Sequence, residues 1–370
     1  MSLGPGRVLQ KDECTAGSPA VRKVHALSSE ALVVCLEFPV FHDPRYLERL
    51  RVLRGVEPVV LPIDPDGDWA SANPSVPHPE PPPWAKSVAE PRRAVLERAH
   101  VLVALNTPEG LLEKAPNLVW IQGIGAGMEQ FARAGAARDG VLVTNASGVS
   151  SGSMAEWVVG RLLQVWKRLR EADAFQRERR FERSYGSTFA GASIGIVGLG
   201  HIGRAVAERV RPFGCRVLGL KRSHRPGDSS EHADELYGPD QLHEMLARCD
   251  AVVVAAPATA DTFHLIDARA LSAMQPHAVL VNVARGSLVD EQALADAMRH
   301  KQIKAAVLDV FDQEPLPDDS PLWDLPGVYV SAHSSVSVDR YMDDVFDLVL
   351  DNIRRYRSGE PLRNVIELEG

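Results

Sequence analysis

With 370 residues, the chain is long enough for about two domains, each with its own buried core. Its 49 acidic residues outnumber 41 lysines and arginines, and the net charge of −8 is opposite to the basic surface that nucleic-acid-binding proteins present. The sequence has no apolar run that could span a bilayer and no signal peptide, so we expect a cytoplasmic protein with no membrane partner and, given its charge, no nucleic-acid partner. Its four cysteines form no Cys-x-x-Cys pair, so we expect neither disulfides nor a metal site.

Strands and helices alternate in the predicted N-terminal part, which indicates a parallel sheet covered by helices on both faces. Residues 1–29 lack periodicity and are interpreted as an extension, and the proline-rich segment 64–91 as a surface insertion or connecting loop. The strands expected here are Ala31–Phe38, Pro58–Ile63, Val101–Leu105, Leu118–Gln122 and Val141–Val143. The helices expected here are Pro44–Gly55, Pro91–Arg98 and Leu111–Lys114.

A second alternating region follows the small, polar stretch Ser147–Ser153, which we interpret as a hinge and a helix cap. Met154–Arg180 is predicted to be one long helix with an apolar face. The strands expected after it are Ile194–Val197, Val217–Leu220, Ala251–Ala255, Ala278–Val283, Ala305–Leu308 and Val328–Val330. The helices expected after it are Arg204–Phe213, Leu236–Leu246, Ala268–Met274, Glu291–His300 and Asp339–Tyr356.

A glycine pattern, G-x-G-x-x-G, directly follows the strand Ile194–Val197 and opens a helix. Gly198 permits a tight turn, Gly200 lets a pyrophosphate approach the backbone, and Gly203 lets the helix pack closely on the strand. Such a pattern alone also occurs in ordinary turns, but the strand, helix and second strand all stand at the expected spacing. We therefore predict a dinucleotide site, whose further cofactor-binding residues are His201, Ile202 and Pro257.

The end of the second strand indicates which dinucleotide binds. NAD enzymes of this fold carry an acidic residue there, which accepts hydrogen bonds from the ribose hydroxyls. Here Lys221, Arg222 and Ser223 follow the strand, and no carboxylate occurs before Asp228. Fixed positive charges and a hydroxyl suit a 2′-phosphate, although a solvated basic loop is the alternative. The sequence therefore predicts that NADP(H) is preferred and that NAD(H) can also serve.

Three further motifs lie just past the carboxyl ends of predicted strands, where open α/β sheets bind ligands. They are Asn282–Gly286, Leu308–Phe311 with Glu314–Leu316, and Ala332–Ser335. With the glycine pattern, these motifs resemble those of the D-isomer-specific 2-hydroxyacid dehydrogenase family over about residues 100–345. The sequence departs from the family pattern at two places, which affect a loop. They are Ala332, in place of the usual proline, and the Ser-Ser-Val that follows His333.

The resemblance implies an α/β fold with two doubly wound parallel-sheet domains, a Rossmann cofactor domain inserted into a flavodoxin-like substrate domain. We place the substrate domain at residues 1–148, the NAD(P)-binding domain at 149–338, and a returning C-terminal helix within 339–370. The family generally forms homodimers through the cofactor domain. Met154–Arg180, with its two tryptophans, is then an interface candidate, unless those rings pack inside the monomer.

Reduction of a 2-keto acid requires a hydride at the carbonyl carbon, a proton at its oxygen and a group that holds the carboxylate. Arg285 offers a planar fork of donors for the carboxylate and the carbonyl. His333 is the natural proton donor because it titrates near working pH, and Glu314 would orient its ring. The matching family motifs carry the same roles at these positions. The alternatives, a surface salt bridge and a structural histidine, do not explain three such residues at successive strand ends.

The resemblance extends to the substrate and the nicotinamide. It implies that Gly125 and Ala126, in a glycine-rich turn after a strand, bind the substrate carboxylate through backbone N–H groups, and such turns are good anion sites. It also implies that Asp309 lies near the nicotinamide carboxamide. Asn106 and Trp84 are further candidates for the pocket, although their spacing does not decide this.

The expected activity is hydride transfer from NAD(P)H to a small 2-keto acid, giving a D-2-hydroxy acid. The Gly-Ile-Gly-Ala-Gly turn and the basic cofactor strand resemble the glyoxylate/hydroxypyruvate reductase branch. We keep two alternatives: a phosphoglycerate dehydrogenase-like enzyme, which an expected lack of a regulatory domain after residue 370 disfavours, and a nucleotide-sensing, corepressor-like binding protein.

Overall fold

The structure is a computed structural model, and it describes residues 9–10, 31–62, 90–107, 110–127, 131 and 141–367. Only residues 9–10 of the predicted extension and residues 90–91 of the predicted proline-rich insertion are described, and Trp84 lies outside the described residues. The chain divides into two compact units, which we call the first unit (Met1–Val149 with Val338–Gly370) and the second unit (Ser150–Ser337). Of the described helices, none is both long and apolar enough to cross a membrane.

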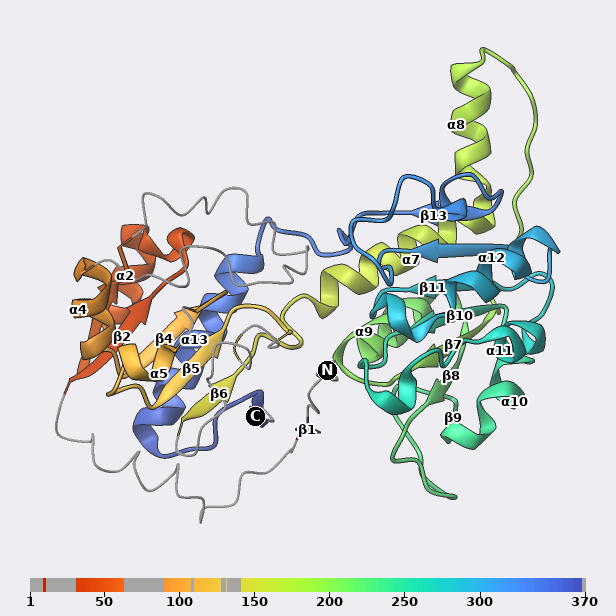
Figure 1. Cartoon of the computed structure of the whole chain (residues 1–370). Helices are drawn as coiled ribbons and strands as arrows, with labels where there is room; N and C mark the ends of the chain where they lie inside the picture. The colour runs from red at the N-terminus through yellow and green to blue at the C-terminus, as the bar shows by residue number, and fades with distance from the viewer. Residues whose placement is uncertain are drawn as a thin grey trace. The chain divides into compact units, whose positions relative to one another are not determined.

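A seven-stranded sheet forms the centre of the first unit, in the order β1-β14-β6-β5-β4-β2-β3 (Figure 1). Strands β2 to β6 are parallel and stand in the flavodoxin-like order 2-1-3-4-5, which confirms the predicted fold class. These strands are β2 (Leu32–Leu36), β3 (Val56–Val60), β4 (Val101–Ala104), β5 (Trp120–Gly123) and β6 (Leu142–Thr144). The helices between them are η2 (Pro39–His42), α2 (Pro44–Arg51), α4 (Glu90–Arg98) and α5 (Leu111–Lys114).

One edge of this sheet departs from the expected parallel pattern. The strand β14 (Val365–Glu367) pairs antiparallel with β6, and β1 (Leu9–Gln10) pairs antiparallel with β14. Neither strand is predicted, because two or three residues are too few to show a period. The end of the chain therefore adds a strand as well as a helix to the first unit.

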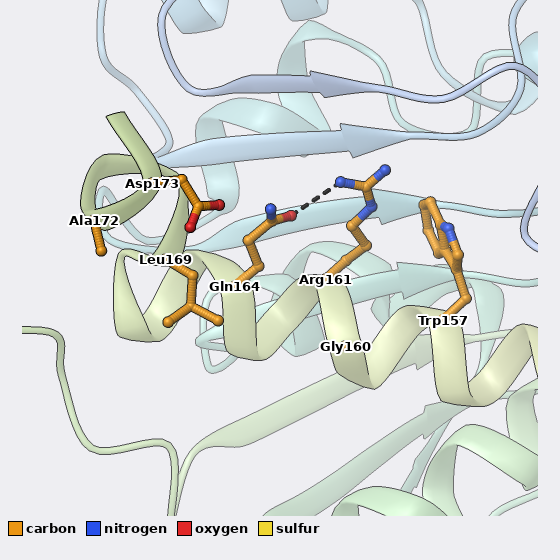
Figure 2. Close-up of a pocket in the computed structure, with 7 residues that line it drawn as sticks. All are labelled: Trp157, Gly160, Arg161, Gln164, Leu169, Ala172 and Asp173. Atoms are coloured by element: carbon orange, nitrogen blue, oxygen red, sulfur yellow. Dashed lines mark hydrogen bonds between the residues drawn. The ribbon is translucent and has the colours of Figure 1, made fainter. Parts of the chain in front are cut away.

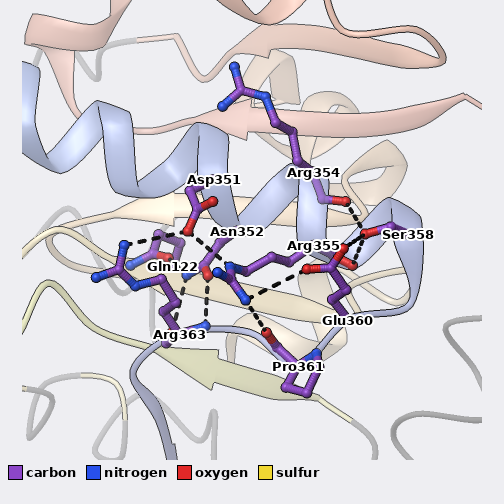
Figure 3. A network of polar contacts seen from close by, with 9 residues as sticks. All are labelled: Gln122, Asp351, Asn352, Arg354, Arg355, Ser358, Glu360, Pro361 and Arg363. Atoms are coloured by element: carbon purple, nitrogen blue, oxygen red, sulfur yellow. Dashed lines mark hydrogen bonds and ion pairs between the residues drawn. The ribbon is translucent and has the colours of Figure 1, made fainter.

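The helix α13 (Tyr341–Ser358) lies against the sheet of the first unit and is held there by apolar and polar contacts (Figure 1). The buried Asn352 amide donates to Gln122 Oε1 at 3.0 Å and accepts from the backbone N–H of Arg363 at 2.8 Å (Figure 3). Gln122 Oε1 also accepts from the Thr144 hydroxyl at 2.8 Å. Because an unpaired buried amide is costly, this chain of hydrogen bonds fixes α13 on β5 and β6.

The second unit contains a seven-stranded parallel sheet in the order β13-β12-β11-β10-β7-β8-β9. Its first six strands in chain order stand as 3-2-1-4-5-6, the Rossmann order, as predicted. The strands are β7 (Ser193–Val197), β8 (Arg216–Leu220), β9 (Glu235–Tyr237), β10 (Ala251–Val254), β11 (Val279–Asn282), β12 (Ala305–Leu308) and β13 (Val328–Val330). The principal helices after β7 are α9 (His201–Val210), α10 (Leu242–Leu246), α11 (Ala268–Ala273) and α12 (Glu291–Arg299).

Two predicted helices of the second unit differ in the structure. The expected helix Met154–Arg180 is broken at Arg168, whose φ of 55° ends α7 (Ser151–Lys167) before α8 (Leu169–Arg177). Trp166 of α7 is buried against Phe189, so one of the two tryptophans of the predicted interface packs inside the monomer.

The expected helix Leu236–Leu246 begins instead as a strand. Residues Glu235–Tyr237 form β9 on the edge of the sheet, and Gly238 and Pro239 separate this strand from α10. The apolar run that suggests one helix is thus divided between the strand β9 and the helix α10. Pro239 separates them, because a proline cannot donate a hydrogen bond inside a helix.

Candidate functional site

The three glycines after β7 each have the environment that their predicted role requires. Gly198 has φ +100°, and a Cβ there would lie 2.8 Å from backbone atoms of Ala256. A Cβ at Gly203 would lie 2.1 Å from the Gly198 carbonyl oxygen, so this glycine lets α9 approach β7. A Cβ at Gly200, by contrast, would meet no atom within 4 Å. Open space in front of the N-cap of α9 fits a pyrophosphate.

The other predicted cofactor residues lie at the same carboxyl edge of the sheet. His201 and Ile202 form the first turn of α9, and Pro257 follows β10, where its carbonyl accepts from the Thr262 hydroxyl at 2.8 Å. This edge adjoins β7 and β10, where the direction of the strand order reverses. Ligands of doubly wound sheets bind at such switch points.

A short basic loop follows β8. Lys221, Arg222 and Ser223 are exposed, and within the described residues neither basic side chain forms an ion pair. The backbone of the loop is ordered by hydrogen bonds from Lys221 N to Tyr237 O at 3.0 Å and from Arg225 N to Asp228 Oδ2 at 2.8 Å. The loop therefore presents its positive charges without carboxylate partners.

The structure brings two of the three predicted catalytic residues into direct contact. His333 Nδ1 lies 2.9 Å from Glu314 Oε2, and Glu314 Oε1 accepts from the backbone N–H of Phe311 at 3.0 Å. Because Glu314 binds Nδ1, the imidazole keeps Nε2 available, and no described residue forms a hydrogen bond or an ion pair with that nitrogen. His333 has φ +46° and donates its backbone N–H to Asp309 O at 2.9 Å.

The ionisation of Glu314 follows from this contact. Burial alone would raise the pKa of its carboxyl, but the hydrogen bonds from His333 and Phe311 and the positive charges of His333 and Arg285 together lower that pKa. Glu314 is therefore a carboxylate at neutral pH and suits an imidazolium partner.

Arg285 begins the loop after β11, and its position depends on the glycine that follows. A Cβ at Gly286 would lie 1.9 Å from the carbonyl carbon of Phe311, so only glycine allows this loop to pack on the loop that carries Glu314. The Arg285 guanidinium is exposed and donates to the Ala284 carbonyl at 2.8 Å. Its remaining N–H groups donate to no acceptor among the described residues. Its positive charge helps to lower the pKa of Glu314.

Asp309, for which we predict a nicotinamide contact, forms a different set of contacts. Its fully buried carboxylate accepts from the Ser331 hydroxyl at 2.7 Å and from the backbone N–H groups of Ser334 and Ser335 at 2.9 and 3.0 Å. These bonds hold the turn that carries His333. This function of Asp309 could not be predicted from the sequence, since it depends on hydrogen bonds to a segment more than twenty residues later.

Gly125 and Ala126 lie in the first unit, in the turn after β5. Ala126 is exposed, and a Cβ at Gly125 would meet only ordinary contacts, the nearest at 3.9 Å. Among the described residues, none accepts a hydrogen bond from the N–H groups of Gly125 or Ala126. Consecutive N–H groups without a partner are suited to an anion. Asn106 follows β4 at the same edge of that sheet.

Comparisons with known proteins show which family this chain is similar to. Residues 159–335 match the model of the D-isomer specific 2-hydroxyacid dehydrogenase, NAD binding domain. The chain is 33% identical over 292 residues to a glyoxylate reductase of Thermococcus gammatolerans, covering 75% of this chain and 86% of that protein. It is 37% identical to a D-3-phosphoglycerate dehydrogenase of Mycobacterium leprae, over 70% of this chain but only 49% of that protein, so it spans about half the length of this relative.

A solved structure is similar over most of the chain. It is a D-isomer specific 2-hydroxyacid dehydrogenase from Xanthobacter autotrophicus Py2 in complex with NADPH and MES, which is 28% identical with a TM-score of 0.70, covering 91% of this chain and 98% of that one. The motifs, the two sheet orders and these similarities lead to one assignment. The chain belongs to the D-isomer-specific 2-hydroxyacid dehydrogenase family.

Proposed function

We propose that the protein reduces a small 2-keto acid of the glyoxylate or hydroxypyruvate kind to the D-2-hydroxy acid, with NADPH as the preferred reductant. The observation that carries this proposal is the His333–Glu314 contact at 2.9 Å, on strand ends of the same sheet edge as the glycine turn. The similarity to a glyoxylate reductase supports the choice of substrate.

In this mechanism, each residue performs a step that its contacts allow. NADPH, when bound at the glycine turn after β7, supplies the hydride. The Arg285 guanidinium binds the carboxylate and polarises the carbonyl, and His333 donates its Nε2 proton to the carbonyl oxygen. Glu314 stabilises the imidazolium through Nδ1 before the transfer, and it holds the neutral ring in one tautomer afterwards. The N–H groups of Gly125 and Ala126 bind the substrate carboxylate.

The preference for NADPH rests on the basic loop after β8. Arg222 and Lys221 are exposed cations without carboxylate partners among the described residues, which suits a 2′-phosphate. The complex of the similar Xanthobacter protein contains NADPH. The variant Lys221→Asp with Arg222→Ala should lose NADPH use far more than NADH use. Lys301→Asp, which changes an exposed lysine before β12 at the opposite edge of the sheet, is the matched control.

A spectrophotometric screen tests the proposed reaction. Glyoxylate, hydroxypyruvate, 3-phosphohydroxypyruvate and larger 2-keto acids are each offered with NADH and with NADPH. We expect the highest kcat/KM for a small keto acid with NADPH, and a loss of about 10²–10⁴-fold in kcat for His333→Ala. His300→Ala, at an exposed histidine whose ring forms a hydrogen bond with the Asp296 carbonyl of the preceding helix turn, should retain activity. A preference for the phosphorylated acid would favour phosphoglycerate chemistry, and no turnover would contradict the proposal.

We also propose that the protein is a homodimer that pairs through α7 and α8. Figure 2 shows a pocket on this surface lined by Trp157, Gly160, Arg161, Gln164, Leu169, Ala172 and Asp173. Arg161 stacks over the Trp157 ring at 4.9 Å, and Leu169 remains about half exposed. An apolar hollow with polar groups at its rim is typical of an interface. Leu169→Asp should convert the dimer to a monomer in analytical ultracentrifugation.

A further inference from the structure

The glycine-rich turn after β5 is held by its carbonyl groups. The Tyr341 hydroxyl donates to the Ile124 carbonyl at 2.6 Å, and the backbone N–H of Ala146 donates to the Gly125 carbonyl at 2.8 Å. The Asn145 side chain donates to the Ala126 carbonyl, also at 2.8 Å. Three consecutive carbonyl oxygens are therefore each bound by a different donor.

These contacts determine where the N–H groups of the turn point. In a trans peptide, the carbonyl bond of one residue and the N–H bond of the next are directed to opposite sides. The peptides of this turn are trans, so the bound carbonyls of Ile124 and Gly125 direct the N–H groups of Gly125 and Ala126 away from the donors that hold them. This geometry agrees with the observation that no described residue accepts from those two N–H groups.

We propose that Tyr341 and Asn145 are positioning residues for the carboxylate of the substrate. Tyr341 fixes the peptide plane that carries the Gly125 N–H, and Asn145 fixes the Ala126–Gly127 peptide, which flanks the plane that carries the Ala126 N–H. This inference rests on the proposed function of the Gly125 turn. Neither side chain touches the substrate; each acts through a peptide of the turn. The proposal also gives α13 a role in substrate recognition. Tyr341 is the first residue of that helix and follows the turn by more than two hundred residues in the sequence.

Both side chains are themselves held firmly. Tyr341 is largely enclosed, and burial raises its pKa to about 12, so the phenol keeps its donor proton at every working pH. Asn145 is buried, its Oδ1 accepts from Ser147 N at 3.0 Å, and its backbone N–H donates to Asn364 O at 3.2 Å. The contacts of Asn145 fix which end of its amide donates to Ala126.

The chain contains a matched control for Tyr341. Tyr356 lies on the same helix, is 4% exposed and has a pKa also raised by burial to about 12, but its hydroxyl has no partner within the part of the chain that the structure describes. Tyr341→Phe and Tyr356→Phe therefore remove the same atom from the same helix. Only the first removal frees a carbonyl of the turn.

The test measures steady-state kinetics and the binding of oxamate to the NADPH complex by calorimetry. For Tyr341→Phe we expect KM for the keto acid and Kd for oxamate to rise about tenfold, the worth of one hydrogen bond, while kcat and KM for NADPH stay within about twofold. Tyr356→Phe should leave all four values unchanged. Asn145→Ala should raise the same two constants, and it takes the place of Tyr341→Phe if that variant does not fold.

Several results would overturn the inference. They are an unchanged KM in Tyr341→Phe, a fall in kcat with KM unchanged, and an equal effect of Tyr356→Phe, which would indicate a general packing defect. If the wild-type protein reduces no 2-keto acid, the proposed function fails. Oxamate binding in the variants still tests the positioning role, because it requires no turnover.

Discussion

The two glycine-rich turns of this protein are held in opposite ways. After β7, the glycines themselves determine the geometry, because added Cβ atoms at Gly198 and Gly203 would collide with backbone at 2.8 and 2.1 Å. After β5, a Cβ at Gly125 would fit without collision, and donors from Ala146 and Tyr341 hold the carbonyls instead. A turn of the first kind can be recognised in the local sequence, whereas a turn of the second kind depends on residues far along the chain.

Added methyl groups in the turn after β7 should have the largest effect. Gly203→Ala should destabilise the protein by about 3 kcal/mol, because the new methyl overlaps the Gly198 carbonyl and lies 2.9 Å from Ile196 Cγ2. Gly200→Ala should keep the stability within about 1 kcal/mol and weaken NADPH binding, since its methyl meets no protein atom but fills the space for a phosphate. Urea unfolding and NADPH fluorescence titration measure the two effects. Equal destabilisation by both changes would contradict this account of the turn.

This contrast also explains how much could be predicted from the sequence. In the second unit the strands are near-continuous apolar runs, and several of them are followed by a motif of a few adjacent residues. The strand order of this unit, and the placement of Arg285, Glu314 and His333 after its strands, could therefore be predicted from the sequence. Gly286 illustrates why, since its tight contact with Phe311 forces glycine beside the arginine.

Other features depend on contacts between distant residues and leave no local pattern. The strand β14 has three residues and is defined by its partner β6. In the sequence, Tyr341 and Asn352 look like ordinary positions of an amphipathic helix. In the structure, Tyr341 donates a hydrogen bond to Ile124, and Asn352 donates one to Gln122. The end of α7 is set by the φ of 55° at Arg168, a residue type that does not signal a left-handed conformation.

The second prediction concerns the long-range contacts that hold α13 in the first unit. Asn352→Ala should lower the free energy of unfolding by about 2–3 kcal/mol, because Gln122 Oε1 and the Arg363 N–H each lose a buried partner. Arg354→Ala is the control, since its guanidinium points away from the network in Figure 3. Chemical denaturation compares the two, and equal stability of both variants would argue against a role of the amide chain.

The third prediction uses a buried acid at the end of β2. Glu37 is 4% exposed; burial raises its pKa to about 8, against the opposing effects of the Leu105 N–H and the charge of Arg92. The folded state then holds a proton that the unfolded chain releases above its own lower pKa, so the stability of the wild type falls as pH rises from about 4.5 to 8. Glu37→Gln removes this loss.

Urea unfolding at several pH values measures the effect of Glu37. Relative to the wild type, Glu37→Gln should gain on the order of 2 kcal/mol between pH 5 and pH 6.5. Glu48→Gln, at an exposed acid on α2, should show no such trend. A parallel pH dependence of Glu37→Gln and the wild type would show that Glu37 is ionised in the folded protein.

The smallest expected effect comes from the contact between Glu314 and His333, which joins two adjacent strand ends of the second unit. Glu314→Gln keeps the size of the side chain and the hydrogen bond from Phe311 but removes the negative charge beside His333 Nδ1. Reduction requires the imidazolium, which loses its proton more readily without the carboxylate. The falling limb of kcat against pH should therefore move to lower pH, while Glu231→Gln, at a strongly exposed acid, leaves the profile in place. A profile that moves to higher pH would mean that Glu314 does not stabilise the proton donor.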